Sequence, residues 1–190
     1  MSGAVGILGG AFDPPHNGHV ALAREAVEHF RLERLLVRVV ADPGHKEVDT
    51  APDLRLQLAE LAFSSLAVAE VSLDPFARTV DSLEQLQLAD PVFLLGADEL
   101  AAFPTWTRPE RVLELARIGA ATRPGIDLAV LEAVIASLSR PDRVELFPIT
   151  PLPVSSSEIR ERVGAGLPID GLVPPAVADA IDRLGLYRAA

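Results

Sequence analysis

The 190-residue sequence contains no cysteine, which excludes a disulfide framework and catalysis by a thiolate. No apolar run is long enough to span a membrane, and Met1-Ser2-Gly3 lacks the basic, apolar and cleavage regions of a signal peptide. We therefore expect a cytoplasmic protein. With 49% hydrophobic residues the chain can bury a sizeable core. We expect one domain over 1–190, with a small C-terminal helical part at about 151–190.

Positive charge is also scarce, because the formal net charge is −10. This argues against nucleic acid or an anionic membrane as a partner. Lys46 is the only lysine and follows His45, while His16 and His19 lie in a separate segment. An acidic protein that handles anions must concentrate its cations, so we predict that these two segments converge on one site. The alternative is a bias toward arginine codons that leaves a single lysine by chance.

Short apolar runs alternate with helical stretches, which indicates an α/β protein with a doubly wound parallel sheet and helices on both faces. Strands are predicted at Ala4–Leu8, Arg34–Val40, Val68–Ser72, Val92–Leu95, Arg117–Ala121 and Arg143–Leu146. Helices are predicted at Gly18–Phe30, Pro52–Ser65, Thr79–Leu88, Pro109–Glu114, Leu128–Ser139, Ser156–Val163 and Pro175–Leu184.

The most informative segment joins the first strand to the first helix: Gly9-Gly10-Ala11-Phe12-Asp13-Pro14-Pro15-His16-Asn17-Gly18-His19. The two glycines let backbone N–H groups approach an anion, and a helix start offers unpaired N–H donors with a favourable dipole. Imidazoles at i and i+3 share one helix face, so both reach the same phosphate. The segment predicts a polyphosphate site. The alternatives are two surface histidines or a metal pair, for which the sequence supplies no obvious further ligands.

Further candidates follow the ends of other predicted elements. Ser155, Ser156 and Ser157 begin a helix, and Arg160 lies one turn later, an arrangement that suits phosphate or an ordinary N-cap with a solvated arginine. Ligands of doubly wound sheets bind outside the carboxyl ends of the strands. The first motif, the predicted loops Asp42–Asp49 and Leu73–Arg78, and the segment Gly96–Asp98 all fall there, so we predict one composite site.

These elements resemble a known family. The segment GGAFDPPHNGH is similar to the HxGH signature of the nucleotidyltransferase superfamily, and Val154–Arg160 resembles its ISSTxIR motif. Together with Gly96-Ala97-Asp98-Glu99-Leu100, Trp106 and the ending Gly185-Leu186-Tyr187-Arg188, they resemble the bacterial nicotinate-mononucleotide adenylyltransferases over nearly the whole chain. The HxGH element alone identifies only the superfamily, whereas the ordered set is more specific.

The resemblance implies a Rossmann-like fold and the transfer of AMP from ATP to nicotinate mononucleotide, by direct attack, with Mg²⁺ as cofactor. It makes His16, His19, Lys46 and Arg160 the catalytic residues. It implies ATP binding by Gly9, Gly10, Phe12, His16, Gly18, His19, Gly96, Asp98, Ser155, Ser156, Ser157 and Arg160. It implies substrate binding by His45, Lys46, Arg78, Thr79 and Trp106. The metal ligands and the oligomeric state, a homo-oligomer included, stay open.

Several of these residues have a purely structural alternative, which for Lys46 and Arg78 is a side chain that points into solvent. Phe12 suits packing, with only its backbone at the nucleotide; Asp98 suits the N-cap of the short helix that follows it; and Trp106 suits half-buried packing instead of stacking on the pyridine ring.

The chain departs from the family pattern in two loops. Gly44 replaces a proline before His45, which favours a more flexible loop. Ala77 and Arg78 stand where the family has serine and tyrosine, and one hypothesis pairs Arg78 with the nicotinate carboxylate. An adenylyltransferase for nicotinamide mononucleotide or phosphopantetheine, or a nucleotide-binding protein without turnover, remains as the alternative function.

Overall fold

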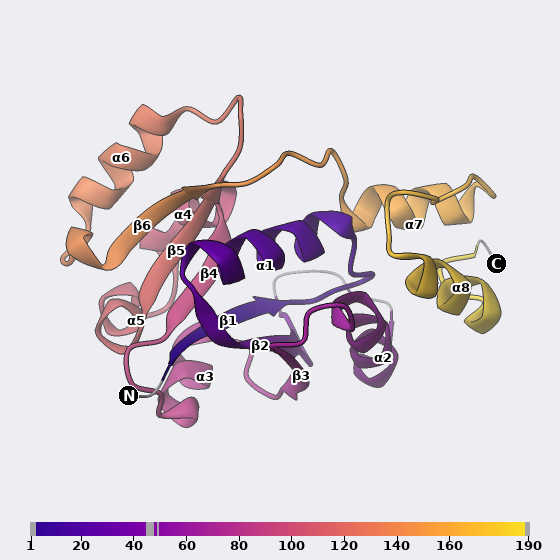
Figure 1. The fold of residues 1–190 in the computed structure, drawn as a ribbon, viewed down its shortest axis with the longest axis horizontal. Coiled ribbons are helices and arrows are strands. Elements are labelled where there is room, and N and C mark those ends of the chain that lie inside the picture. The colour runs from indigo at the N-terminus through magenta and orange to yellow at the C-terminus, as the bar shows by residue number, and fades with distance from the viewer. Residues whose placement is uncertain (1–2, 45–47, 49, 189–190) are drawn as a thin grey trace.

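The computed structural model describes residues 3–44, 48 and 50–188. Parallel strands and helices alternate along the chain, as predicted (Figure 1). The strands are β1 (Ala4–Gly10), β2 (Leu32–Val40), β3 (Ala69–Asp74), β4 (Val92–Gly96), β5 (Arg117–Thr122) and β6 (Val144–Pro148). The α-helices are α1 (Asn17–His29), α2 (Pro52–Phe63), α3 (Thr79–Leu86), α4 (Ala97–Ala102), α5 (Pro109–Leu115), α6 (Leu128–Ser137), α7 (Ser156–Gly164) and α8 (Pro175–Leu184). Two 3₁₀ turns cover Phe103–Thr105 and Pro141–Arg143.

The predicted strands and helices are confirmed, with ends that shift by no more than two residues. Helix α3 ends before the predicted Leu88 because its C-cap, Gln87, adopts the left-handed conformation with φ of 48°. Helix α7 begins after the N-cap Ser155, whose hydroxyl accepts a hydrogen bond from the backbone N–H of Glu158. Helix α8 begins with Pro175, at the position where a missing N–H costs no helical hydrogen bond.

The sheet has the order β3-β2-β1-β4-β5-β6, and every neighbouring pair is parallel. Chain order runs outward from β1 in one direction and from β4 in the other. The crevice outside the carboxyl ends of β1 and β4 is therefore the switch point, where doubly wound sheets bind their ligands. The predicted Rossmann-like α/β fold is confirmed.

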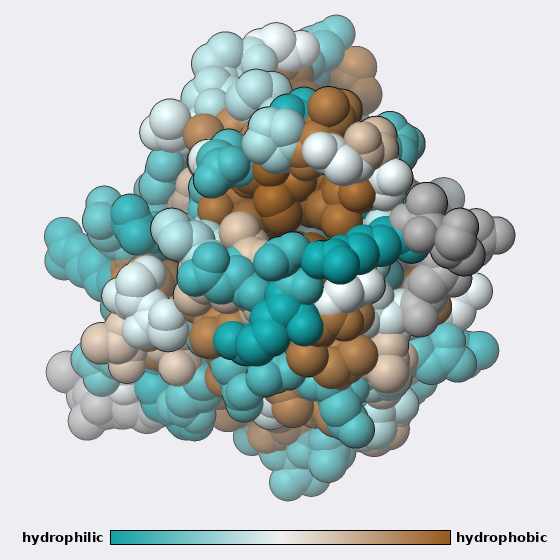
Figure 2. Space-filling view, turned by 90° about the vertical axis from the view of Figure 1, so that its right-hand side faces the viewer, coloured by the Kyte–Doolittle hydropathy of each residue, from teal (hydrophilic) through white to brown (hydrophobic). Residues whose placement is uncertain are grey.

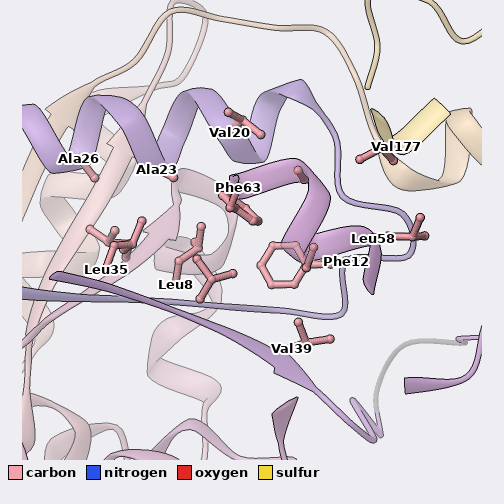
Figure 3. Packing of buried hydrophobic residues seen from close by; sticks show 14 of the residues in the cluster. Leu8, Phe12, Val20, Ala23, Ala26, Leu35, Val39, Leu58, Phe63 and Val177 are labelled. Atoms are coloured by element: carbon pink, nitrogen blue, oxygen red, sulfur yellow. The ribbon is translucent and has the colours of Figure 1, made fainter. Parts of the chain in front are cut away.

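Alternate residues of the central strands face opposite hydrophobic layers. Leu8 of β1 packs in a cluster with α1, α2, α7 and α8, whereas its neighbour Ile7 packs in a second cluster with α3, α4, α5 and α6. Figure 3 shows the first cluster, where Phe63 of α2 lies between α1 and the sheet and Leu58 of α2 lies beyond the end of α1. Burial of apolar area on both faces of one sheet is the main term that stabilises this architecture.

The C-terminal part, α7 and α8, lies beyond the carboxyl end of β1 (Figure 1). Ile159 of α7 and Val177 of α8 are fully buried and belong to the same cluster as Leu58. The last helices therefore cover the switch-point end of the first layer. No helix among residues 3–44 and 50–188 combines the length and the apolar character that a membrane span requires.

Replacement of Leu58 by alanine is expected to lower the free energy of unfolding by about 2–5 kcal/mol, because its fully buried side chain would leave a cavity under α2. Leu128, which is 49% exposed on α6, provides the matched control. Urea unfolding of the wild type, Leu58→Ala and Leu128→Ala measures both. Equal losses for the two variants would contradict this placement of the core.

Candidate active site

The residues between β1 and α1, Ala11–His16, form what we call the first loop, and it lies at the switch point. It has no regular secondary structure, so its shape depends on contacts with other segments. Figure 2 views the end of the molecule that carries α7 and α8 and shows a hollow with a hydrophobic floor and hydrophilic side chains around it. The first loop, α2 and the C-terminal segment meet at this end.

Phe12 anchors the first loop in the core, as its packing alternative predicts. Its side chain is 2% exposed and lies among Leu8, Val39, Leu58 and Phe63 (Figure 3). The backbone at Phe12 takes a φ of 51°, a left-handed conformation that a bulky residue rarely adopts. Packing of the ring outweighs the strain of this turn. The side chain of Phe12 is therefore part of the core, and a contact of its backbone with a nucleotide stays a prediction.

His16 and His19 lie together where α1 begins. His16 is the N-cap residue and His19 is the third residue of the helix, and their rings stack with centroids 3.7 Å apart. The backbone N–H of His16 donates to Nδ1 of His19 at 3.2 Å. Because Nδ1 of His19 accepts, the proton of the neutral ring is on Nε2, which makes Nε2 the donor. The structure thus brings the two predicted catalytic histidines into one unit.

Burial keeps the ring of His16 uncharged, since it lowers the pKa of His16 to about 4. Its Nδ1 is buried and has no hydrogen-bond partner among the described residues. Gly18 allows this packing, because a Cβ at Gly18 would lie 3.0 Å from Nδ1 of His16 and 3.3 Å from Cγ1 of Val154. The HxGH spacing therefore has a steric reason: the glycine leaves room for the first imidazole.

The start of α1 is less open than the sequence predicts. The backbone N–H of Asn17 donates to the carbonyl of Leu172 at 2.9 Å, and that of His19 donates to the carbonyl of His16 at 2.9 Å. The side chain of Asn17 also donates to the carbonyl of Gly171 at 2.7 Å. Because these donors are engaged, the start of α1 offers fewer free N–H groups than an isolated helix start would.

Arg55 of α2 holds the backbone beneath the first loop. Its side chain is 1% exposed, and its guanidinium donates to the carbonyls of Ala11, Val40, Ala41 and Thr50 at 2.7–3.0 Å. Burial lowers the pKa of Arg55, while the carboxylate of Asp13 opposes this shift. One buried cation therefore ties the ends of β1 and β2 to the start of α2.

The C-terminal part holds the first loop from the other side. Ser156 Oγ donates to the carbonyl of Pro14 at 2.8 Å, and Arg160 Nη1 donates to the carbonyl of Asp13 at 2.7 Å. The hydroxyl of Tyr187 donates to Oδ1 of Asp13 at 2.7 Å. Ser156 and Arg160, predicted as phosphate ligands, thus have a second task in the folded chain: they hold the loop that carries the histidines.

The other two serines of this segment have different roles. Ser155 caps α7, as its structural alternative predicts. Ser157 is exposed, and its hydroxyl accepts from Arg160 Nη2 at 3.4 Å. The guanidinium of Arg160 is thereby held at the start of α7, next to the first loop. A direct contact of these residues with phosphate stays a prediction.

At the end of β4, the predicted ligands Gly96 and Asp98 have different structural roles. Gly96 ends β4 and is itself the N-cap residue of α4, so the N-cap alternative for Asp98 is wrong. The side chain of Asp98 is 84% exposed, and Arg123 Nη2 lies 3.9 Å from its Oδ2. Asp98 is therefore accessible at the carboxyl end of β4, where a ligand can reach it.

Trp106 packs half-buried against the second cluster. Its ring lies edge-on to Phe93 at a centroid distance of 6.2 Å and is tilted against Phe103 at 5.3 Å. The ring is thus fixed by aromatic neighbours on the β4 side of the switch point. Stacking of its remaining face on a pyridine stays a prediction.

The predicted substrate loop leads from β3 into α3. Arg78 is the exposed N-cap residue of α3, and Thr79 is its half-buried first residue. Buried Asp74 holds this loop, because its Oδ1 accepts from the N–H of Phe76 at 3.1 Å and its Oδ2 accepts from Ser82 Oγ at 2.6 Å. The other predicted substrate residues, His45 and Lys46, lie outside the described residues.

Sequence reasoning missed two residues that shape the site. Arg55 occupies the same helical face as Leu58, Ala59 and Ala62, all of them buried. An arginine within an apolar stripe is the signal that could have identified it. Tyr187 stands in the quoted ending Gly185–Arg188, but no local pattern indicates its contact with Asp13.

The described residues include no group of three or more His, Asp or Glu side chains that could hold a metal ion. The predicted Mg²⁺ thus finds no ready set of side-chain ligands within residues 3–44, 48 and 50–188.

Comparison with known proteins supplies the family. Residues 7–162 match the cytidylyltransferase-like family. The chain is 38% identical over 196 residues to a probable nicotinate-nucleotide adenylyltransferase of Thermomicrobium roseum, covering 97% of this chain and 91% of that protein. It is also 38% identical to a protein of the same description from Bordetella avium, covering 98% of each chain.

Solved structures share the fold at lower identity. The nicotinic acid mononucleotide adenylyltransferase of Plasmodium falciparum, complexed with NaAD, superposes with a TM-score of 0.77 at 19% identity over 98% of each chain. A putative nicotinate-nucleotide adenylyltransferase of Vibrio parahaemolyticus has a TM-score of 0.71 at 20% identity and is covered over 98% of its length, with 100% of this chain covered.

The burial of His16 predicts a loss of stability in mild acid. Its pKa is about 4 in the folded protein, against the ordinary value of 6.5 for a histidine in water, so between these values the unfolded chain binds a proton that the folded chain rejects. The contribution is complete above pH 6.5 and is lost as the pH falls toward 4, by at most about 1.4 kcal/mol per pH unit.

Urea unfolding at pH 7 and pH 5 checks this expectation, and NMR titration of the ring gives the pKa directly. The variant His16→Gln lacks the titrating group, so it should lose less stability than the wild type between the two pH values. An imidazole of His16 that titrates near 6.5 would show that the ring is not buried as described.

Proposed function

Because the chain belongs to the nicotinate-nucleotide adenylyltransferase family, we propose that it transfers AMP from ATP to nicotinate mononucleotide and releases pyrophosphate. The product is nicotinate adenine dinucleotide, a precursor in NAD biosynthesis. The observation that carries this proposal is the stacked pair His16 and His19 on a loop held from both sides.

The reaction needs no covalent intermediate. A phosphate oxygen of the mononucleotide attacks the α-phosphorus of ATP, and the bond from that phosphorus to the oxygen bridging to the β-phosphate breaks. Negative charge on the transferred group and on the leaving pyrophosphate must be stabilised in the transition state. Nε2 of His19 is a neutral N–H donor for this task, and the ring of His16 is uncharged as well. We propose that Nε2 of His19 donates to these phosphate oxygens, that the uncharged ring of His16 lies beside them, and that positive charge comes from other residues.

Arg160 is the best placed of these cations among the described residues. Its Nη1 is bound to the carbonyl of Asp13, so the guanidinium is oriented beside the first loop before any ligand arrives. We propose that Arg160, the start of α7 and Lys46 face the β- and γ-phosphates. Mg²⁺ is proposed to enter with ATP and, when bound there, neutralises charge on the same phosphates.

We assign the adenosine side and the pyridine side of the site from the positions of the predicted residues in the fold. Gly9, Gly10 and Gly96 lie at the carboxyl ends of adjacent strands β1 and β4, which we propose as the adenosine side. Trp106 and the start of α3, with Arg78 and Thr79, are proposed to receive the pyridine mononucleotide. The acidic net charge favours small substrates in the cytoplasm over a nucleic-acid or membrane partner.

Loss of the Nε2 donor of His19 is expected to lower kcat about 10²–10³-fold, because one preorganised donor to the transition state is removed. The measurement is pyrophosphate release with ATP and nicotinate mononucleotide, for the wild type and His19→Ala. His29→Asn is the matched control, since His29 ends the same helix and its side chain hydrogen-bonds to Glu145 on the surface.

The same assay with nicotinamide mononucleotide and phosphopantetheine separates the possible substrates. Turnover of nicotinate mononucleotide by the wild type, with a slow His19 variant and a normal His29 variant, supports the proposal. Tight ATP binding without turnover of any of the three would instead indicate a binding protein.

Arg78 tests the recognition of the pyridine. If its guanidinium pairs with the nicotinate carboxylate, Arg78→Ala should lower kcat/KM for the acid about 10-fold or more and leave the amide almost unchanged. Arg140→Ala is the control, because Arg140 is another exposed arginine and lies near the amino end of β6, at the opposite edge of the sheet. An unchanged acid-to-amide ratio in Arg78→Ala would rule out this contact.

A further inference from the structure

The carboxylate of Asp13 is a buried group of the first loop that is only partly satisfied. Asp13 is 3% exposed, and its Oδ1 accepts a hydrogen bond from the hydroxyl of Tyr187 at 2.7 Å. Its Oδ2 is buried with no hydrogen-bond partner among the described residues. A buried carboxylate is costly unless donors and a counter-charge compensate it. Here Tyr187 supplies the donor and Arg55 supplies the counter-charge.

The chain delivers Tyr187 to Asp13 through a defined turn. At the end of α8, Gly185 adopts φ of 63°, its N–H donates to the carbonyl of Asp182, and the N–H of Leu186 donates to the carbonyl of Ile181. These two hydrogen bonds form a Schellman motif, which ends the helix and reverses the chain. Tyr187, itself at φ of 61°, thereby points back toward a loop 174 residues earlier.

The hydroxyl of Tyr187 is held as a proton donor. Burial and the Asp13 carboxylate both raise the pKa of Tyr187, so the hydroxyl stays protonated at neutral pH. Thr50, whose backbone carbonyl is bound by Arg55, lines the same pocket as Tyr187. The C-terminal segment and Arg55 therefore meet at Asp13.

A displacement of Asp13 would also move His16, because the segment between them is stiff. Only Pro14 and Pro15 separate Asp13 from His16, and proline fixes φ at each of these positions. His16 in turn stacks on His19 and donates its backbone N–H to that ring. The orientation of both imidazoles thus depends on where Asp13 is held.

We infer that Tyr187 is a positioning residue for the active site, whose hydroxyl fixes Asp13 and thereby the orientation of His16 and His19. The inference rests on the proposed function for its kinetic consequence, but not for its structural one.

The test compares Tyr187→Phe with Arg188→Gln. The first removes only the hydroxyl, and the second removes the neighbouring hydrogen bond from Arg188 to Asp182, which holds the same segment without touching the first loop. For Tyr187→Phe we expect kcat to fall about 10–100-fold, since displacements of about 1 Å cost as much as 10²-fold, with KM for ATP changed less. We also expect the NMR-measured pKa of His16 to rise from about 4 toward 6.5 as its packing loosens. Arg188→Gln should retain both wild-type values.

Unfolding curves establish that each variant is folded at the assay temperature. If Tyr187→Phe is not folded, Gly185→Ala strains the turn that carries Tyr187 and should give the same pair of changes. Wild-type kcat and an unshifted His16 in a folded Tyr187→Phe overturn the inference, as does an equal fall of kcat in Arg188→Gln. Absence of adenylyl transfer by the wild type refutes the proposed function alone, because the titration of His16 still tests the position of the loop.

Discussion

The guanidinium of Arg55 satisfies four carbonyl oxygens at the place where β1, β2 and α2 approach one another. These carbonyls lie at or just beyond the ends of β1 and β2 and shortly before α2. A buried acceptor without a donor costs about 1–3 kcal/mol. Arg55 removes this cost for all four at once, although its own charge is buried in doing so. The first loop is held by these hydrogen bonds of Arg55, and the negative charge of Asp13 acts on the Arg55 guanidinium.

This arrangement explains how an acidic protein presents an anion site. Burial keeps the ring of His16 uncharged, and Nδ1 of His19 accepts a backbone hydrogen bond, so the two rings stack closely without compensating carboxylates. The guanidinium of Arg55 donates to backbone carbonyls. In Arg160, Nη1 donates to the carbonyl of Asp13, whereas Nη2 makes only a long hydrogen bond to Ser157 Oγ. In the proposed function, hydrogen-bond donation and charge neutralisation would thus fall to different residues of a protein whose net charge is −10.

Local features of this protein were predictable from the sequence because local physics determines them. The apolar run of β1, the amphipathic α8 with Pro175 at its start and the N-cap Ser155 each need only their neighbours in the chain. The role of Arg55 was not predictable, because its acceptors lie up to 44 residues away. The N-cap alternative for Asp98 was wrong for a local reason. Both Asp98 and Gly96 suit an N-cap, and the helix begins directly after Gly96 at the end of β4.

The two glycines that end β1 differ in what requires them. A Cβ at Gly10 would lie 3.0 Å from the ring of Phe12, so a side chain there would press on that ring. A Cβ at Gly9 would lie 3.6 Å from Cζ of Phe93, an ordinary contact distance, and Gly9 is exposed. Packing against the described residues therefore leaves room for a side chain at Gly9. A glycine that the fold does not need, at the carboxyl end of the strand beside the switch point, is expected where a ligand lies against the backbone. Gly10 thus makes room for the ring that anchors the first loop, while the described residues give no packing reason for a glycine at Gly9, which fits its predicted contact with ATP.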